Sequence, residues 1–492
     1  MSSHDTLQIV AKAFRESLPS SGYVSVFRID QLDRIGIPVV QANLILPNEP
    51  ATIGYGYGFE SIEAEVGALG ELCEEVHVGL WVKQAPYFVA SFAELARTRG
   101  ASQVVDPLTL CLPAGSPYTP EMPLSWVEAQ RWPSGEPVAV PREWVAAYPY
   151  QLGEPARLIT PITNGLGAGL DLPHAVAHGL MELLQRDGNV VSYRALDQGV
   201  VVDLDRLEET DVRSLLDHLR GLDIDVTVKL AGDDFSIANL YVVANDCGTP
   251  TVPIQVTSCG EAAHPDRIRG LRKALLEFCG SRSRKASTHG PIDVVRAVLP
   301  RDYTDRQISV ALLEEEENRA LEAMAEWIGQ DAAELHHRLS KSVFAERRRV
   351  RLSDLPTVSP AAIADSATRL NLLIARLAVE GLEPIIIDCS PPDSPVKVVK
   401  TIVPGLESET MSYRRIGWRN VRRLRARDDK LLLDAPREGA LRVRLRPQDE
   451  DKAGGPAWFD AHLADQLVGQ LYPLYRESGP FSAQLLRQRR AA

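Results

Sequence analysis

The 492-residue sequence contains no apolar run long enough to cross a membrane, and its six cysteines include no CxxC pair. A transmembrane helix needs about 20 mostly apolar residues, so no membrane-spanning segment is expected. Six cysteines in so long a chain predict neither a disulfide framework nor a zinc finger. The first residues, MSSHDTLQIV, lack the basic and then apolar order of a secretory signal. We therefore expect a cytoplasmic protein without a membrane partner.

Positive charge is also in short supply. Lysine accounts for only 10 of the 54 basic residues, and 66 acidic residues bring the net charge to −12. This balance argues against a strongly basic nucleic-acid binder. The hydrophobic share of 45% and the charged share of 24% are ordinary for globular proteins. The sequence therefore predicts a globular chain with no nucleic-acid partner.

Short β-like runs alternate with longer helical patterns, which favours an α/β protein. The expected strands are residues 37–46, 200–204, 225–230, 237–243, 253–256, 384–388 and 396–402. The expected helices are residues 61–76, 172–187, 266–283, 309–326 and 361–380. Residues 112–155 predict an irregular insertion with short strands. Because no flexible Gly/Ser linker separates these parts, one large intertwined domain is expected, with mixed sheets flanked by helices.

The predicted helix 61–76 carries an apolar stripe on one face and Gly67, Gly70, Glu71, Glu74 and Glu75 on the other. A glycine inside a helix costs about 1 kcal/mol relative to alanine, so we expect another group to approach the backbone there. Glu71 and Glu74 project together at i, i+3 and suit a hard cation such as Mg²⁺. The alternative is a solvated acidic face.

The segment TNGLGAGLDLPHAVAHGLMELLQRD predicts a glycine-rich loop at residues 165–169, followed by a helix capped by Asp171. A loop before a helix N-terminus suits phosphate, although GLGAG matches no dinucleotide fingerprint. The polar stripe of the helix consists of His174, His178, Glu182 and Gln185. A zinc site at the two histidines is disfavoured, because no third ligand is evident.

Two further segments are weaker signals. The predicted helix 266–283 places Glu277 and Arg282 away from its apolar stripe, and its simplest interpretation is a basic amphipathic helix. Residues 397–407 (KVVKTIVPGLE) predict a strand that ends in a Pro-Gly turn.

In this order, the segments resemble the YcaO family over about residues 23–425. Glu71 and Glu74 match its first E-x-x-E pair, and Glu277 and Arg282 match its third motif. The run from Glu182 to Asp187 matches its E-x-x-E-R-D motif at three of four defined positions, through Glu182, Arg186 and Asp187. The resemblance implies a domain over residues 23–425, with a helical extension at residues 1–22 and a charged extension at residues 426–492.

The resemblance also implies an activity. Members of the family use ATP and Mg²⁺ to phosphorylate a backbone amide oxygen of a peptide or protein, and the product is a thioamide, an azoline or an amidine. It implies Glu71, Glu74 and Glu182 as metal ligands. The implied nucleotide-binding residues are Glu71, Glu74, His174, Gln185, Arg186, Glu277 and Arg282. The implied catalytic residues are Glu182, Arg186 and Arg282.

Several positions depart from the family pattern. Tyr57 stands where GKG has lysine, and Gly280 replaces a glutamine. His174 and Gln185 each replace a glutamate. One hypothesis is a divergent active enzyme, in which His174 either contacts phosphate or marks a lost metal ligand. The alternative is a catalytically silent scaffold that binds a peptide or partner through a decayed nucleotide site.

The end of the sequence, FSAQLLRQRRAA, lacks the proline-rich PxPxP tail of many azoline-forming members. This favours thioamide or amidine formation, which in the family often needs a partner protein for sulfur delivery or substrate recognition. A homodimer is left open.

Overall fold

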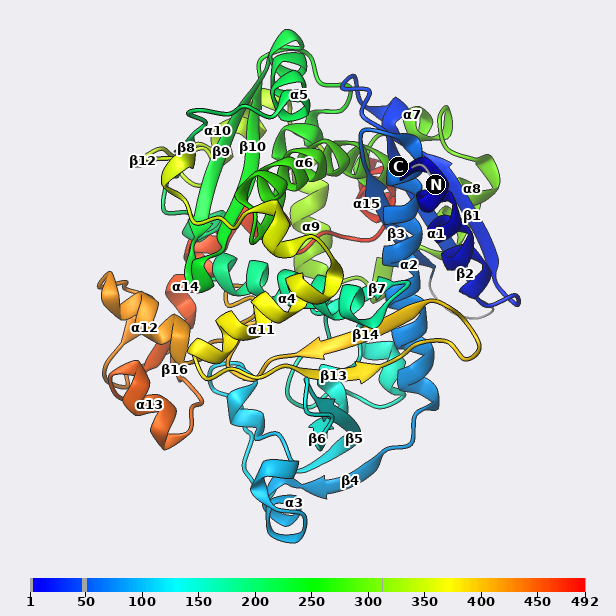
Figure 1. Ribbon diagram of the computed structural model, residues 1–492. Coiled ribbons are helices and arrows are strands. Elements are labelled where there is room, and N and C mark those ends of the chain that lie inside the picture. The colour runs from blue at the N-terminus through cyan, green and yellow to red at the C-terminus, as the bar shows by residue number, and fades with distance from the viewer. Residues whose placement is uncertain (1–2, 47–50, 312, 492) are drawn as a thin grey trace. The chain divides into compact units, whose positions relative to one another are not determined.

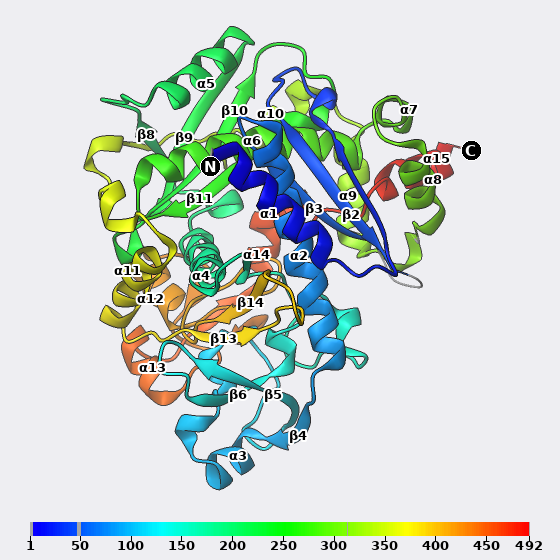
Figure 2. The ribbon, with the colours of Figure 1, turned by 45° about the vertical axis from the view of Figure 1, so that its right-hand side comes forward.

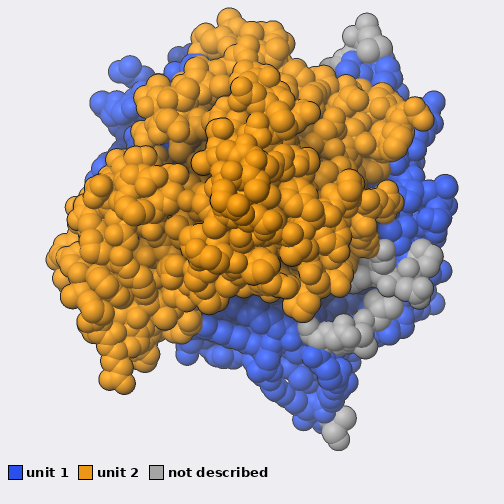
Figure 3. All heavy atoms as spheres, turned by 90° about the horizontal axis from the view of Figure 1, so that it is seen from below, with its two compact units in different colours: residues 1–72, 192–358, 468–492 blue, residues 73–191, 359–467 orange. Residues whose placement is uncertain are grey.

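The computed structural model describes residues 3–46, 51–311 and 313–491. The chain divides into two compact units, coloured separately in Figure 3, and each unit combines segments that are far apart in sequence. Unit 1 comprises Met1–Leu72, Ser192–Val358 and Val468–Ala492, and unit 2 comprises Cys73–Val191 and Ser359–Leu467. Mixed sheets with flanking helices confirm the expected α/β class and its intertwined chain path. The predicted domain limits at residues 22 and 425 do not coincide with the unit boundaries.

The described residues of unit 1 form two sheets. The antiparallel three-stranded sheet consists of β1 (Tyr23–Arg28), β2 (Val39–Ile45) and β3 (Thr52–Tyr57). The five-stranded sheet has the order β11 (Gly260–His264), β10 (Ala238–Asp246), β9 (Ile224–Gly232), β8 (Val200–Asp203) and β12 (Arg348–Arg351). Its pairs are antiparallel except β8–β12, where Val200 lies beside Arg348 in a parallel register.

Helix α6 (Arg267–His289) packs along β10 and β11 of the five-stranded sheet, as Figure 1 shows. Asp266 caps it by accepting hydrogen bonds from two backbone N–H groups of its first turn. Its apolar side buries Leu271, Leu275 and Phe278 in the core. The other helices of this unit are α1 (Ser3–Ser17), α5 (Thr210–Gly221), α7 (Ile292–Arg296), α8 (Arg301–Val310), α9 (Asn318–Trp327), α10 (Ala332–Leu339) and α15 (Ser482–Ala491).

Unit 2 is built on a six-stranded sheet. Its order is β4 (Phe88–Ser91), β5 (Pro123–Arg131), β13 (Ile385–Asp388), β14 (Lys397–Ile402) and β7 (Leu166–Gly169), with β6 (Pro137–Pro141) paired to β5. A second, small sheet consists of β15 (Leu432–Leu433), β17 (Trp458–Asp460) and β16 (Ala440–Arg442).

Helix α4 (Leu172–Asn189) contacts β7 and β14 on one side and α11 (Ser366–Val379) on the other, an arrangement visible in Figure 2. The other helices of unit 2 are α3 (Phe92–Thr98), α12 (Trp418–Ala426), α13 (Pro447–Ala453) and α14 (Ala461–Val468). Helix α2 (Ser61–Gln84) contributes its first part to unit 1 and its second part to unit 2.

Most expected elements are present, but three expectations were wrong. Residues 253–256 form a 3-10 helix (Pro253–Thr257), because proline begins it and the Gln255 side chain accepts a hydrogen bond from the Val252 N–H. The expected loop at residues 165–169 is strand β7, whose Gly167 pairs with Val399. The expected helix 309–326 is divided between α8 and α9, and its residue 312 lies outside the described part.

None of the helices in the described ranges combines the length and the apolar character that a membrane span requires.

Candidate functional site

Three helices that carry predicted site glutamates each lie directly against a glycine of a neighbouring strand. A Cβ atom added to Gly56 of β3 would lie 2.0 Å from the Ala64 carbonyl oxygen of α2. The corresponding distance is 2.0 Å from Gly167 of β7 to the Ala175 carbonyl oxygen, and 2.1 Å from Gly260 of β11 to the Ala274 carbonyl oxygen. Only glycine permits strand and helix backbones to approach this closely.

The close approach expected at the glycines of helix 61–76 is confirmed at Gly67. A Cβ atom added to Gly67 would lie 3.2 Å from the Cα atom of Gly56, so the approaching group is the backbone of β3. At Gly70 an added Cβ atom would lie 3.4 Å from Cε2 of Phe14, which is an ordinary van der Waals contact. Gly67 therefore serves packing within unit 1.

In unit 1, strand β3 supplies hydrogen bonds to two of the predicted glutamates. The Tyr55 backbone N–H donates to the Glu71 carboxylate at 2.6 Å, and the Tyr57 hydroxyl donates to the Glu277 carboxylate at 2.9 Å. Burial, and then the charge of Glu277, raise the pKa of Tyr57 well above its usual value. Tyr57 therefore stays a neutral donor, and both carboxylates are held in place from the same strand.

Arg282 is engaged differently. Its guanidinium is fully buried and donates to Asp33 at 2.7 and 3.1 Å and to Asp246 at 2.8 Å. Burial opposes the charged form, but the two aspartates more than offset it and raise the pKa of Arg282. In this conformation Arg282 links α6 to the segment after β1 and to β10, and its predicted contact with a nucleotide stays a prediction.

In unit 2, the two predicted metal ligands again accept hydrogen bonds from backbone N–H groups. The Ala168 N–H of β7 donates to Glu74 at 2.9 Å, and the Gly165 N–H donates to Glu182 at 2.9 Å. Arg186 lies one turn beyond Glu182, and the two side chains form an ion pair at 3.3 Å. β7 and the residue before it therefore fix two carboxylates that the sequence places 108 positions apart.

His174 and Gln185 lie at opposite ends of the predicted polar stripe. His174 is exposed in the first turn of α4, where its backbone N–H donates to the capping Asp171. Desolvation of the ring, and then the charge of Arg369, lower the pKa of His174. The imidazole of His174 is therefore neutral at neutral pH. Gln185, at the other end of the stripe, is buried. The predicted cap at Asp171 is confirmed.

Lys400 is a candidate that the sequence analysis passed over as part of an ordinary strand. It is buried in β14, donates to the Ile162 carbonyl oxygen at 2.8 Å and interacts electrostatically with Glu182. Burial lowers its pKa to about 8, an effect that the charge of Glu182 opposes. The sequence did offer a signal for Lys400, because a lysine in the middle of an apolar strand is costly to bury unless its charge is paired or hydrogen-bonded.

The far end of α4 is fixed by a second buried network. Asp187 accepts hydrogen bonds from Arg423 at 2.6 Å and from the Glu407 backbone N–H at 3.1 Å. Burial, and then the charge of Asp187, raise the pKa of Glu407 to about 7. Asp187, which matches the last position of the family motif, thus anchors α4 to the turn after β14.

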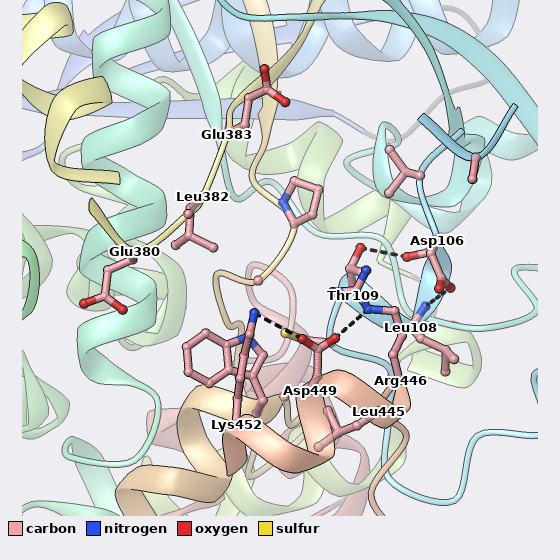
Figure 4. A pocket seen from close by; sticks show the side chains of 18 of the residues that line it. Asp106, Leu108, Thr109, Glu380, Leu382, Glu383, Leu445, Arg446, Asp449 and Lys452 are labelled. Atoms are coloured by element: carbon pink, nitrogen blue, oxygen red, sulfur yellow. Dashed lines mark hydrogen bonds and ion pairs between the residues drawn. The ribbon is translucent and has the colours of Figure 1, made fainter. Parts of the chain in front are cut away.

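A cavity of about 270 Å³ in unit 2 is lined by none of the predicted site residues. Figure 4 shows its floor, where Asp449 of α13 accepts a hydrogen bond from Arg446 at 2.6 Å and lies 3.6 Å from the Lys452 ammonium. Arg131 and Glu383, which also line the cavity, form a further ion pair. Because the cavity contains none of the residues to which the sequence assigns chemistry, it is not the candidate site.

Comparison with known proteins identifies the family. Residues 55–407 match the family profile described as YcaO cyclodehydratase, ATP- and Mg²⁺-binding. An uncharacterized protein of Methanothermobacter thermautotrophicus is 27% identical over 415 residues, which cover 83% of this chain and 96% of that protein.

Two solved structures share the fold. YcaO from Methanopyrus kandleri bound with AMPPCP and Mg²⁺ has a TM-score of 0.56 and 20% identity, and the match covers 85% of this chain and 94% of that one. A heterocyclase in complex with substrate and cofactor has a TM-score of 0.58 and 19% identity over 81% of this chain. The match covers 52% of the heterocyclase, so this chain spans about half its length. Since the family profile matches well over half of the sequence, the chain belongs to the YcaO family, whose domain binds ATP and Mg²⁺.

Proposed function

We propose that this protein is an enzyme that uses ATP and Mg²⁺ to phosphorylate a backbone amide oxygen of a peptide or protein, with a thioamide as the product. ATP bound with Mg²⁺ would supply the phosphoryl group that turns the amide oxygen into a leaving group. A partner protein would deliver sulfur or recognise the substrate. Azoline and amidine formation are the related reactions that the product analysis must distinguish.

The observation that carries the proposal is that backbone N–H groups hold the carboxylates of Glu71, Glu74 and Glu182 in place. Each carboxylate accepts a hydrogen bond from a backbone N–H of a glycine-rich strand or of the residue before it. Carboxylate oxygens are the ligands that Mg²⁺ prefers, and a carboxylate fixed in advance loses less freedom on binding. The donor chemistry of these residues therefore fits Mg²⁺.

No group of three or more His, Cys, Asp or Glu side chains within the described ranges is arranged to hold a metal ion. Mg²⁺ at nucleotide sites is usually held by one or two carboxylates, with phosphate oxygens and water completing its octahedron. One or two of the proposed ligands Glu71, Glu74 and Glu182 would suffice for that mode of binding.

The other predicted residues receive roles that follow from their surroundings. Glu277 is held by Tyr57 and Arg186 by Glu182, and we assign both as polar contacts for the nucleotide. We assign His174 as the position of a lost metal ligand, because its lowered pKa leaves a neutral ring that offers no positive charge to a phosphate. Gln185 completes the nucleotide-binding set, and Arg282 supports it by fixing α6 through Asp33 and Asp246.

The similarity to the Methanopyrus kandleri YcaO, which was solved with AMPPCP and Mg²⁺, supports nucleotide binding by this fold. Calorimetry with AMPPCP, with and without Mg²⁺, tests the proposal directly. We expect Mg²⁺-dependent binding, and the absence of binding at millimolar nucleotide would contradict it.

Product analysis separates the possible reactions. The protein, ATP, Mg²⁺, sulfide and a peptide library should give a peptide whose mass rises by the exchange of oxygen for sulfur. Loss of water from the peptide would instead indicate azoline formation, and incorporation of an amine would indicate an amidine.

A catalytically silent scaffold is the second candidate, and the loss of carboxylates at His174 and Gln185 favours it. A scaffold would bind peptide or partner without Mg²⁺-dependent binding of AMPPCP. The same calorimetry therefore decides between the two functions.

A further inference from the structure

Tyr57 is the last residue of β3 in unit 1, and β3 contacts α6. Its hydroxyl donates a hydrogen bond to the Glu277 carboxylate at 2.9 Å. The contact joins residues that are 220 positions apart in the sequence. Glu277 is therefore held by a neutral aromatic donor from another element.

The tyrosine ring needs the space that Gly280 leaves. A Cβ atom added to Gly280 would lie 2.8 Å from Cδ1 of Tyr57, 3.2 Å from its Cγ and 3.3 Å from its Cβ. The first distance is too short for two carbon atoms in van der Waals contact. Gly280 has an ordinary helical backbone in α6, so the ring, and not the backbone conformation, excludes a side chain there.

The hydroxyl group also lies among negative charges. Glu277, Glu71 and Glu261 all interact electrostatically with Tyr57, and they come from three elements, α6, α2 and β11. In such surroundings a hydrogen bond from a neutral hydroxyl group stabilises one ionised carboxylate without adding another charge. A phenylalanine would keep the ring packing and lose this effect, which makes the hydroxyl group separately testable.

We propose that Tyr57 is the positioning residue for Glu277, that Gly280 supplies the space it requires, and that the two departures from the family pattern are one coupled exchange. This inference rests on the proposed function, because the role of Glu277 is to contact the nucleotide. It also explains why tyrosine at position 57 and glycine at position 280 do not indicate a decayed site.

The first test isolates the hydroxyl group. We expect Tyr57→Phe to weaken the binding of AMPPCP with Mg²⁺ about tenfold or more in calorimetry, as for the loss of a hydrogen bond to a charged group. The matched control is Tyr303→Phe, which removes another buried hydroxyl of unit 1 that pairs with Gln41 at 2.7 Å. The control should lower thermal stability and leave the affinity for AMPPCP unchanged.

The second test isolates the coupling. Gly280→Gln should weaken AMPPCP binding, because the new side chain displaces the ring of Tyr57. The double variant Tyr57→Lys/Gly280→Gln should recover most of the affinity, because lysine removes the ring and still offers a donor to Glu277. In the absence of nucleotide, Gly280→Ala should lower the unfolding midpoint of the wild-type chain and change it much less in the Tyr57→Ala background.

The outcomes distinguish a failure of the proposed function from a failure of this inference alone. A wild-type chain that does not bind AMPPCP overturns the proposed function and this inference with it. A wild-type chain that binds, with Tyr57→Phe binding equally well, overturns the inference alone. Additive effects of the substitutions at positions 57 and 280, in binding and in the unfolding cycle, would overturn the coupled exchange.

Discussion

The Glu74 carboxylate accepts a hydrogen bond from the Ala168 backbone N–H at 2.9 Å, across 94 residues of sequence. The same carboxylate lies 3.8 Å from the Nε2 atom of His178. Glu74 is thus held by the backbone of β7 in an orientation that its own helix does not determine. The packing of the glycine-rich strand β7 against α2 therefore fixes the position of Glu74, a proposed metal ligand.

The charge of Glu74 is the first testable element. Glu74→Gln keeps the shape of the side chain and its ability to accept a hydrogen bond, but removes the negative charge. We expect the affinity for AMPPCP with Mg²⁺ to fall by roughly 10- to 100-fold with little change in thermal stability, as measured by calorimetry. Glu128→Gln is the control, because Glu128 is an exposed residue of the same unit that pairs with Arg99. If Glu74→Gln binds AMPPCP as tightly as Glu128→Gln does, Glu74 is not a metal ligand.

The strand glycines that lie against α2, α4 and α6 should not tolerate a side chain. Gly167→Ala places a Cβ atom against the Ala175 carbonyl oxygen, so β7 and α4 must separate. We expect a loss of about 1–3 kcal/mol in urea denaturation. Gly221→Ala is the matched control, since no atom lies within 4 Å of its added Cβ atom and alanine favours the helix. A Gly167→Ala protein as stable as wild type would show that the close approach does not limit packing.

Arg282 should be essential for stability. Arg282→Met leaves Asp33 buried without its counter-charge, whereas Asp246 keeps its ion pair with Arg34. We expect a loss of about 3–5 kcal/mol in the free energy of unfolding. Adding Asp33→Asn to the same protein should restore part of the lost stability, because the uncompensated charge is then gone. A small effect of Arg282→Met would argue that Arg282 is free to serve the nucleotide.

Glu407 should make stability depend on pH. Its pKa is raised from 4.5 to about 7, so the folded chain holds this proton more tightly than the unfolded chain does. The resulting stabilisation is complete below about pH 4.5 and is lost as the pH rises through about 7. We expect Glu407→Gln to remove this fall from the stability profile measured by denaturation between pH 5 and 8. A variant with the wild-type slope would place the titrating group elsewhere.

His174 tests whether the departures from the family pattern impair the site. Its lowered pKa leaves the imidazole neutral above its ordinary titration range, so it offers no positive charge to a phosphate at neutral pH. We expect His174→Glu to retain AMPPCP binding and to lower the Mg²⁺ concentration required for it, since a carboxylate is the better ligand. Loss of binding in this variant would show that His174 contacts the phosphates.

Much of the candidate site followed from the sequence, because its parts are local. The i, i+3 pair of Glu71 and Glu74, the cap at Asp171 and the stripe through Glu182 depend on helix periodicity alone. The ordered set of these motifs also identified the family. Helix glycines such as Gly67 correctly predicted a close backbone approach, since glycine in a helix is unfavourable without a packing reason.

Other features were decided only by tertiary structure. The segment GLGAG has the composition of a loop, and it is a strand because β14 supplies its hydrogen-bond partners. The buried pairing of Arg282 depends on Asp33 and Asp246, which lie 249 and 36 residues away. The contact of Tyr57 with Gly280 and Glu277 brings a strand and a helix together. Local sequence determines which face a side chain occupies, whereas the long-range packing of other segments determines which partner it meets there.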